Sequence, residues 1–371
     1  MRFPEFTKEW EEHALAEYLD FKNGLNPDVK RIGRGLPFIS VMDILADGTI
    51  NNDSIRGKVE ATEREIENFS VEKGDILFQR SSETLEDVGR ANVYMDNRTA
   101  VYGGFVIRGR KIGDYNPLFF KYLLSTPLAR KRTCRMGAGT QHFNIGQDGL
   151  SKISLCFPLM EEQNKIARLL SLIDERIATQ NKIIEKLQSL IKGLRVCCMQ
   201  RNGSNNVYLS EIAQIYQPQT ISSAELTEDG FLVYGANGII GKYKDYNHKT
   251  EQICITCRGN TCGMVNYTKP MSWITGNAMV INTDKYQDKV YKKYLYHYLS
   301  AYNFNSIISG SGQPQIVRTP LEKLKITLPT ISEQKQKAMI LDKVQDKIEI
   351  NHNILNLYIL QKQYLLRQMF I

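Results

Sequence analysis

The chain of 371 residues lacks the features of several common protein classes. No apolar run reaches the roughly 18–20 residues that cross a membrane. Segment 1–10 carries charges and a proline where a signal peptide would be apolar. The seven cysteines are an odd number and include the neighbours Cys197 and Cys198. We therefore expect no membrane partner and no disulfide framework, and a reducing prokaryotic cytoplasm.

Motifs for cofactor chemistry are incomplete. The loop 137–139 lacks the third glycine of a dinucleotide site, because residue 142 is histidine. Gly241 and Lys242 resemble the end of a phosphate-binding loop, but Tyr243 stands where the metal-binding Ser or Thr belongs. The sequence predicts no catalytic site and no cofactor on this chain.

Two further patterns have a structural and a functional interpretation. Asn116-Pro117 resembles part of an amino-methyltransferase motif, but a helix start with Asn as cap explains it more simply. Cys254, Cys257 and Cys262, with His248 nearby, have partial zinc-site spacing. Small buried thiols in a strand are the favoured interpretation, so we predict no metal site.

The composition allows a nucleic-acid partner without requiring one. Lys and Arg number 48 against 40 Asp and Glu, which gives a net charge of +8. Many proteins without nucleic-acid ligands have a similar excess. Hydrophobic residues make up 42% of the chain, enough for sizeable cores, and the length suggests two or three domains.

An internal repeat organises the chain. A shift of 171 residues aligns Leu150, Lys152, Pro158, Glu162, Gln163 and Ala167 with Leu321, Lys323, Pro329, Glu333, Gln334 and Ala338, all identical. At another offset, Leu15-Ala16-Glu17 matches Leu209-Ser210-Glu211. The chain therefore alternates a variable segment and a conserved helix twice: 1–158, 159–200, 201–330 and 331–371.

Both conserved segments have the 3.5-residue apolar period of a coiled-coil seam. The predicted seam residues are Ile166, Leu170, Ile173, Ile177, Gln180, Ile184, Leu187, Ile191 and Leu194, and, in the second helix, Leu341, Val344, Ile348, Asn351, Leu355, Tyr358 and Leu365. Lysines occupy two further positions of the second seam, 337 and 362. The amides Gln180 and Asn351 are either a buried layer that fixes register or surface residues. A helix of about 57 Å cannot bury such a seam in one small domain, so we predict that the two helices pair antiparallel. Ser332 is the expected cap of the second helix.

The variable segments predict two α+β domains of one plan. Each has buried strands, an amphipathic helix and a glycine loop. The expected elements are strands at 76–78, 104–107, 253–255 and 278–281, helices at 117–124 and 291–299, and loops at 137–141 and 310–313.

Basic and amide side chains near these loops suit DNA. Cations neutralise phosphates, amides pair with adenine and arginine pairs with guanine. The candidates are Arg80, Arg130, Lys131, Arg132, Arg135, Gln141, His142 and Asn144, and, in the second half, Asn237, Lys242, Lys244, Arg258, Asn260, Gln313, Gln315 and Arg318. A solvated helix end is an equally good explanation of cluster 130–135.

Together these features resemble the specificity (S) subunit of type I restriction–modification systems. The resemblance rests on Phe3-Pro4-Glu5-Phe6, Leu209-Ser210-Glu211-Ile212, the stretch 234–241, Gly310-Ser311-Gly312-Gln313 and both Glu-Gln heptad units. It implies a non-catalytic subunit in which two target recognition domains, related by a pseudo-twofold repeat, each read half of a bipartite asymmetric site of double-stranded DNA. The helices would set the spacer.

The resemblance also implies partners. Two modification subunits would methylate adenine with S-adenosylmethionine, and two restriction subunits would use ATP and Mg²⁺ to cut DNA. Two alternatives stay open from the residues alone: a stand-alone methyltransferase or nuclease, and a coiled-coil assembly protein without a DNA role.

Overall fold

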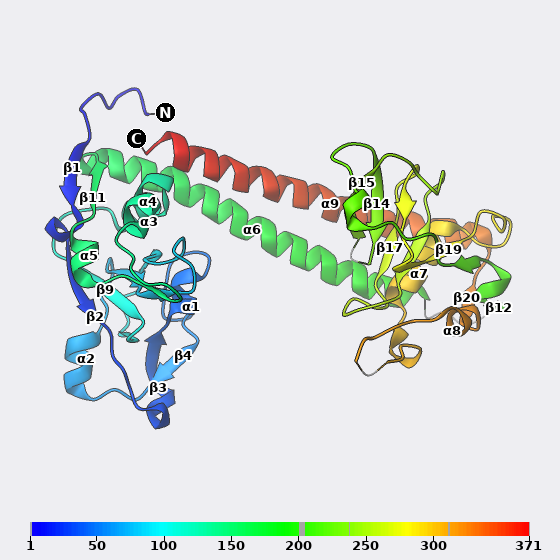
Figure 1. Ribbon diagram of the computed structural model, residues 1–371, viewed down its shortest axis with the longest axis horizontal. Coiled ribbons are helices and arrows are strands. Elements are labelled where there is room, and N and C mark those ends of the chain that lie inside the picture. The colour runs from blue at the N-terminus through cyan, green and yellow to red at the C-terminus, as the bar shows by residue number, and fades with distance from the viewer. Residues whose placement is uncertain (1, 200–204, 237, 311, 371) are drawn as a thin grey trace. The chain divides into compact units, whose positions relative to one another are not determined.

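The computed structural model describes residues 2–199, 205–236, 238–310 and 312–370 (Figure 1). They form two compact units, Met1–Asn181 with Ile354–Ile371, and Lys182–Asn353. Each unit holds one α+β domain and parts of two long helices, α6 (Met160–Met199) and α9 (Ile331–Gln368). The expected boundary between 200 and 201 lies outside the described residues.

Short strands in small sheets make up the domain of the first unit. They are β1 (Glu11–Ala14), β2 (Leu19–Asn23), β3 (Ile32–Ile39), β4 (Gly57–Val59), β5 (Ile76–Gln79), β6 (Ser81–Ser82), β7 (Ala91–Val93), β8 (Val101–Tyr102), β9 (Val106–Lys111), β10 (Phe143–Asn144) and β11 (Ser154–Phe157). An antiparallel sheet has the order β2-β9-β5-β7. In a second sheet β3 pairs antiparallel with β4 and parallel with β8. β1 pairs with β11, which precedes α6.

The second domain repeats this topology. Its strands are β12 (Asn205–Tyr208), β13 (Gln214–Tyr216), β14 (Phe231–Gly235), β15 (Gly238–Tyr243), β16 (Ile253–Thr256), β17 (Val265–Tyr267), β18 (Trp273–Ile274), β19 (Ala278–Asn282) and β20 (Lys325–Leu328). The antiparallel order is β13-β19-β16-β17, β14 pairs antiparallel with β15 and parallel with β18, and β12 pairs with β20. Each strand matches one of the first domain in order, so the repeat in sequence is a repeat in fold.

Burial explains the apolar runs of the central strands. All four residues of β5 and all four of β16 are buried, as expected of strands covered on both faces. The strand expected at 104–107 instead begins at Val106. Phe105 is 69% exposed, because Gly104 and Phe105 form a turn before the strand.

Short helices complete both domains. They are α1 (Val41–Leu45), α2 (Glu63–Phe69), α3 (Pro117–Ser125), α4 (Pro127–Cys134), α5 (Gln147–Ser151), α7 (Lys292–Ala301) and α8 (Arg318–Glu322). The amide N–H of Phe119 donates to Oδ1 of Asn116 at 3.0 Å, and Pro117 occupies the first position of α3. The prediction that Asn116-Pro117 starts a helix is confirmed.

In the first unit, the start of α6 pairs with the end of α9. Nζ of Lys362 lies 2.6 Å from Oδ1 of Asp174, and Nη1 of Arg176 donates to the Tyr358 hydroxyl at 3.2 Å. A later residue of α6 thus meets an earlier residue of α9. The pairing in this unit is antiparallel.

In the second unit, the end of α6 pairs with the start of α9 in the same sense. Nη2 of Arg195 donates to Oε1 of Gln345 at 3.4 Å, and Nζ of Lys337 donates to the carbonyl of Cys198 at 2.9 Å. Lys337 therefore satisfies a carbonyl in the last turn of α6, which explains a lysine at a seam position.

The seam residues face inward within their own units. All nine predicted positions on α6 and all seven on α9 are buried or half-buried. Gln180 is only 8% exposed, so the surface interpretation of this amide is wrong. Asn351 is half-buried, and its Nδ2 donates to the carbonyl of Lys347 at 2.6 Å.

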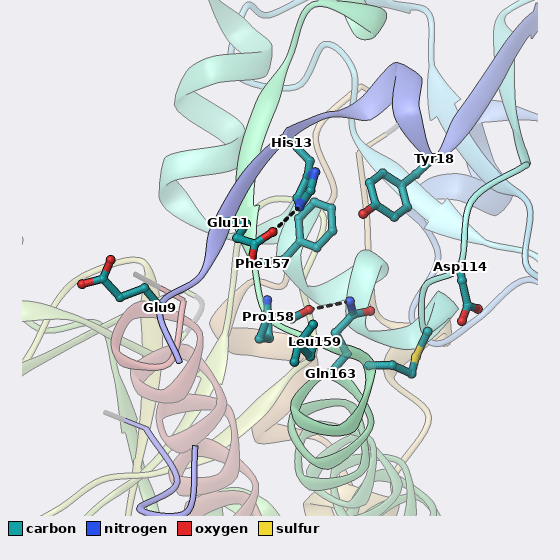
Figure 2. A pocket seen from close by; sticks show the side chains of 10 residues that line it. Glu9, Glu11, His13, Tyr18, Asp114, Phe157, Pro158, Leu159 and Gln163 are labelled. Carbon is teal, nitrogen blue, oxygen red and sulfur yellow. Dashed lines mark hydrogen bonds and ion pairs between the residues drawn. The ribbon is translucent and has the colours of Figure 1, made fainter. Parts of the chain in front are cut away.

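The repeated glutamines Gln163 and Gln334 make the same two connections. Nε2 of Gln163 donates to the carbonyl of Pro158 at 2.9 Å (Figure 2). Its Oε1 accepts from the amide of Asn116 at 3.0 Å. Gln334 bonds likewise to Pro329, at 2.9 Å, and to the amide of Tyr291, at 2.8 Å. Each buried amide therefore ties the start of a long helix to the start of α3 or α7.

The cap of α9 differs from the expectation. Ser332 lies inside the helix, and Thr330 is the capping residue. Oγ1 of Thr330 accepts from the amide of Glu333 at 3.3 Å, while the Glu333 carboxylate accepts from the amide of Thr330 at 3.0 Å. This reciprocal capping box begins two residues before the serine.

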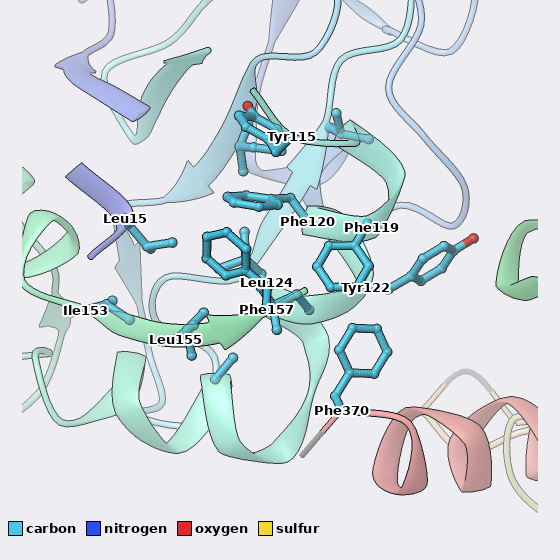
Figure 3. Packing of buried hydrophobic residues seen from close by; sticks show 14 of the residues in the cluster. Leu15, Tyr115, Phe119, Phe120, Tyr122, Leu124, Ile153, Leu155, Phe157 and Phe370 are labelled. Carbon is cyan, nitrogen blue, oxygen red and sulfur yellow. The ribbon is translucent and has the colours of Figure 1, made fainter. Parts of the chain in front are cut away.

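Aromatic rings fill the core of the first unit (Figure 3). The rings of Tyr115 and Phe120 stack with centroids 4.0 Å apart, and Phe119 lies 5.4 Å from Phe370. Phe370 follows α9, so the last described residues of the chain complete a core that begins at Leu15.

One position of α3 and α7 anchors each domain to the long helices. In the first unit the Tyr122 hydroxyl donates to Asp174 at 2.8 Å. In the second unit His297, fully buried, bonds Asp342 through Nε2 at 3.0 Å and accepts at Nδ1 from Arg195 at 3.3 Å. Lys293 also pairs with Asp342 at 3.0 Å. The two anchors differ in their acid–base chemistry, because burial lowers the pKa of His297 and raises the pKa of the Tyr122 hydroxyl.

Replacing Gln163 or Gln334 with Leu should destabilise the chain. The change at Gln163 removes the partner of one carbonyl and one amide, and the change at Gln334 that of two carbonyls and one amide. The cost is about 1–3 kcal/mol for each group. Chemical denaturation measures the loss, with Gln188→Leu on an exposed face of α6 as the control. That control should stay within about 0.5 kcal/mol of wild type. Equal stabilities of all three variants would contradict the assigned role.

Acidification from pH 7 to 5 should destabilise the second unit. Burial, reinforced by the Arg195 cation, lowers the pKa of His297 although Asp342 opposes the shift. The folded chain then binds this proton less readily than the unfolded chain, so stability is complete above about pH 6.5 and falls below it. Burial lowers the pKa of His248 too, which adds to the same window.

Thermal unfolding between pH 5 and 8 tests this. His297→Gln should flatten the pH dependence, and adding His248→Gln should flatten it further. Tyr122→Phe removes the matching hydroxyl in the first unit and should lower the melting temperature equally at every pH. An unchanged slope in both histidine variants would show that other groups carry the dependence.

Candidate nucleic-acid interface

Three chain segments lie side by side where the central strand of the first domain ends. The amide of Arg80 donates to the carbonyl of Phe105 at 2.9 Å, and the amide of Ile145 donates to the carbonyl of Arg80 at 3.0 Å. β6 and β10 continue this pairing. We call residues 80–82, 103–105 and 141–145 the first loop edge.

The second domain builds the same frame. The amide of Cys257 donates to the carbonyl of Asn277 at 3.1 Å, and the amide of Ile316 donates to the carbonyl of Cys257 at 3.0 Å. Arg258 forms a bridge with Gln315. Residues 257–260, 275–277 and 313–316 are the second loop edge. Since backbone groups make these bonds, the frame does not depend on the side chains it carries.

The loop edges bring together about half of the predicted DNA-binding residues. On the first, Gln141, His142 and Asn144 are exposed, while Arg80 is half-buried and its Nη1 reaches the carbonyl of Gly104 at 3.4 Å. On the second, the exposed members are Arg258, Asn260, Gln313 and Gln315. Exposed amide and guanidinium groups on a fixed backbone are suited to base edges.

The predicted basic cluster divides into two kinds of side chain. Arg130 Nη2 donates to the carbonyls of Glu86 and Val88 at 2.8 and 2.6 Å, and burial lowers the pKa of its guanidinium. Arg132 pairs with Glu12 at 2.7 Å and also reaches the carbonyl of Ser154. These two arginines are engaged within the first unit.

Lys131 and Arg135 remain exposed on and beside α4. Their charges are therefore available to phosphates, whereas those of Arg130 and Arg132 hold α4 against its own domain.

Of the other predicted cations of the second domain, Lys242 and Lys244 lie apart from its loop edge in sequence, whereas Arg318 follows that edge by two residues. Lys242 and Lys244 are in and just after β15, and Lys242 lies 3.5 Å from the exposed Asp229. Arg318 pairs with Glu322 at 2.6 Å at the start of α8. Asn237 lies outside the described residues.

Two members of the first loop edge escaped the sequence prediction. Ser81 pairs with Asn144 through its hydroxyl. Its signal was available, because two serines follow a buried strand after a single arginine. Phe105 was counted within a buried strand, and no local pattern separates it from the apolar residues that follow.

Of the three cysteines expected in a strand, Cys254 lies in one, whereas Cys257 directly follows that strand and Cys262 lies in a turn. Cys254 is buried in β16, where burial raises the pKa of its thiol to about 12. Sγ of Cys257 lies 3.2 Å from the carbonyl of Asn277. His248 bonds the Tyr216 hydroxyl at 2.9 Å. Among the residues that the structure describes, no group of three or more His, Cys, Asp and Glu side chains could hold a metal ion.

A pocket of about 180 Å³ lies where β1, the end of β11 and the start of α6 meet (Figure 2). Glu9, Glu11 and Asp114 line it, and His13 lies between Glu11, at 3.9 Å, and Glu17, at 2.9 Å. The bond from His13 lowers the pKa of Glu17. Carboxylates repel phosphates, so this pocket is unsuited to a DNA backbone.

None of the described helices is long and apolar enough to span a membrane.

Comparisons with known proteins agree with the repeat. The family model for the type I restriction modification DNA specificity domain matches residues 7–189 and 202–357, one copy in each half. The putative type I restriction enzyme MjaX specificity subunit of Methanocaldococcus jannaschii is 25% identical over 93% of this chain and 89% of its own length. The EcoprrI specificity subunit of Escherichia coli is 32% identical over 36% of this chain and 34% of its own.

A solved structure shares the fold. The S subunit of the type I restriction–modification system from M. genitalium superimposes with a TM-score of 0.68 at 16% identity, covering 98% of this chain and 96% of that one. With two copies of the specificity domain, each on its own part of the long helices, the chain belongs to the type I restriction–modification DNA specificity family, whose members recognise DNA and are not themselves catalytic.

Proposed function

We propose that each domain of this specificity subunit reads one half of a bipartite, asymmetric DNA site. The observation that carries the proposal is one backbone frame with different side chains at equivalent positions. Ser81 on the first loop edge corresponds to Arg258 on the second. Asn144 corresponds to Gln315, 171 residues later. Two frames of one shape with unlike side chains are suited to two unlike half-sites.

The chemistry of these side chains favours major-groove reading. Asn and Gln pair bidentately with adenine, and Arg pairs with guanine. Phosphate contacts from Lys131, Arg135, Lys242 and Lys244 would position the domains, one or two helical turns apart on the DNA. The long helices would set that separation and so the spacer.

The long helices also suit partner subunits. Ile350, Leu357 and Tyr364 follow one another at heptad spacing on α9 and are all more than half exposed. We propose that helices of two modification subunits cover such positions and that two restriction subunits join the assembly. S-adenosylmethionine, ATP and Mg²⁺ would bind those partners. All seven cysteines are free thiols, which supports a reducing prokaryotic cytoplasm.

Binding to duplex DNA should weaken by about 10³-fold between 50 and 200 mM salt if some six phosphates are neutralised. Lys131→Gln and Arg135→Gln should each reduce the slope of log affinity against log salt by about 1, for every DNA sequence alike. Fluorescence anisotropy over a salt series measures both effects.

Arg132→Gln is the matched control, because Arg132 lies one residue from Lys131 and three residues from Arg135. Because Arg132 already pairs with Glu12, its loss should lower thermal stability and leave the salt slope unchanged. A flat salt dependence of the wild-type chain would contradict DNA recognition through phosphates.

Lengthening both long helices should lengthen the gap between the half-sites. Four residues after Asn181 in α6 and four after Asn353 in α9 add about 6 Å, or one to two base pairs. Methylome sequencing of a host that expresses the variant with its modification subunits reads the gap directly. Insertion into α6 alone should disturb helix pairing and abolish methylation. An unchanged gap in the double insertion would refute the spacer role of the helices.

A further inference from the structure

We propose that Phe105 reads the C5-methyl group of a thymine in the half-site of the first domain. This inference rests on the proposed function, and it assigns base specificity to a residue outside the polar set.

The turn holds Phe105 outward on a rigid backbone. The amide of Arg80 binds its carbonyl at 2.9 Å, yet its side chain is 69% exposed. A Cβ atom on Gly104 would lie 1.8 Å from Oδ1 of Asn26, and one on Gly24 would lie 2.1 Å from the carbonyl oxygen of Gly103. This close packing leaves the turn little conformational freedom. The backbone that carries the ring is therefore already ordered before DNA binds, and binding has little backbone entropy left to lose.

The segments that neighbour Phe105 on the loop edge carry polar side chains. Asn144 is exposed on the same loop edge, and Nη1 of Arg80 reaches the carbonyl of Gly104 directly before the ring. In the major groove the thymine methyl is the apolar group that a base pair presents, beside acceptors and donors of adenine. An amide and an aromatic ring on one edge therefore match the two kinds of group that an A·T pair presents.

The equivalent position of the second domain carries other chemistry. Asn277 accepts from the amide of Cys257 as Phe105 accepts from that of Arg80, and its side chain is also exposed. Gly276 corresponds to Gly104, and a Cβ atom there would lie 2.5 Å from Oγ1 of Thr220. The backbone position is thus kept while its side chain changes from apolar to amide, as at Ser81 and Arg258. If this position served only to pack a core, its side chain would be apolar in both domains.

Exposure of one aromatic residue is not enough by itself, because single exposed apolar side chains are common. Ile112 illustrates this: it is 61% exposed directly after β9, whereas Phe105 directly precedes that strand. The two side chains therefore lie at opposite ends of one strand, about 20 Å apart. Ile112 is the matched control for Phe105.

Deoxyuridine tests the contact, because it lacks only the methyl group and still pairs with adenine. Methylome sequencing first defines the half-sites, and each thymine is then replaced singly in a duplex titrated with the full chain and its modification subunits. At one thymine of the first half-site, the wild-type complex should lose about three- to fivefold in affinity. Phe105→Ala and Phe105→Asn should bind more weakly and be indifferent to that replacement.

Phe105→Leu should retain part of the sensitivity, and Ile112→Ala should behave as wild type. The Asn variant guards against misfolding, since the second domain carries Asn at this position. If every thymine of the first half-site tolerates deoxyuridine, or if Phe105→Ala stays as sensitive as wild type, the proposal is overturned while DNA recognition stands. If the wild-type complex binds no duplex, the proposed function itself fails.

Discussion

Burial of the two apolar seams is the constraint on which both units depend. A helix of 40 residues with an apolar seam needs an apolar partner along its length, and neither domain is large enough to supply one. In each unit the antiparallel stretch of the other long helix supplies part of that partner, and in the first unit Ile166, Leu170 and Ile173 also join the domain core. The core of the first unit even takes in Phe370, more than 200 residues from most of its neighbours. The first domain therefore shares one core with residues of both long helices.

The domains solve a second problem, which is how to vary a surface without losing a fold. Backbone bonds from Arg80 to Phe105 and from Cys257 to Asn277 build both loop edges, and glycines pack where no side chain fits. The side chains that repeat in both halves lie elsewhere, at Gln163 and Gln334, which tie the domains to the helices. Rigid anchors and a side-chain-independent frame leave the exposed positions free to change.

The sequence predicted what depends on repetition and period. The heptads located α6 and α9, and Asn116-Pro117 located the start of α3. It could not show what tertiary contacts decide. Arg130 and Arg132 resemble a phosphate cluster until the carbonyls of Glu86 and Val88 and the carboxylate of Glu12 are in place. Phe105 resembles a strand residue until the turn at Gly104 exposes it. Neither outcome is encoded in local pattern, because the groups that bond to Arg130, to Arg132 and to the carbonyl of Phe105 are distant in sequence.

Duplication within one chain has a consequence that a symmetric dimer would not have. Two identical subunits about a twofold axis present identical surfaces and so suit a palindrome. Fused copies share a backbone frame but mutate independently. In this chain the side chains at equivalent positions of the loop edges and of the anchors differ. Tyr122 and His297 occupy one position of the plan, yet burial raises the pKa of the tyrosine hydroxyl and lowers the pKa of the histidine. Acid should therefore weaken the contact between domain and long helices in the second half more than in the first. The two halves also differ in the side chains on their loop edges.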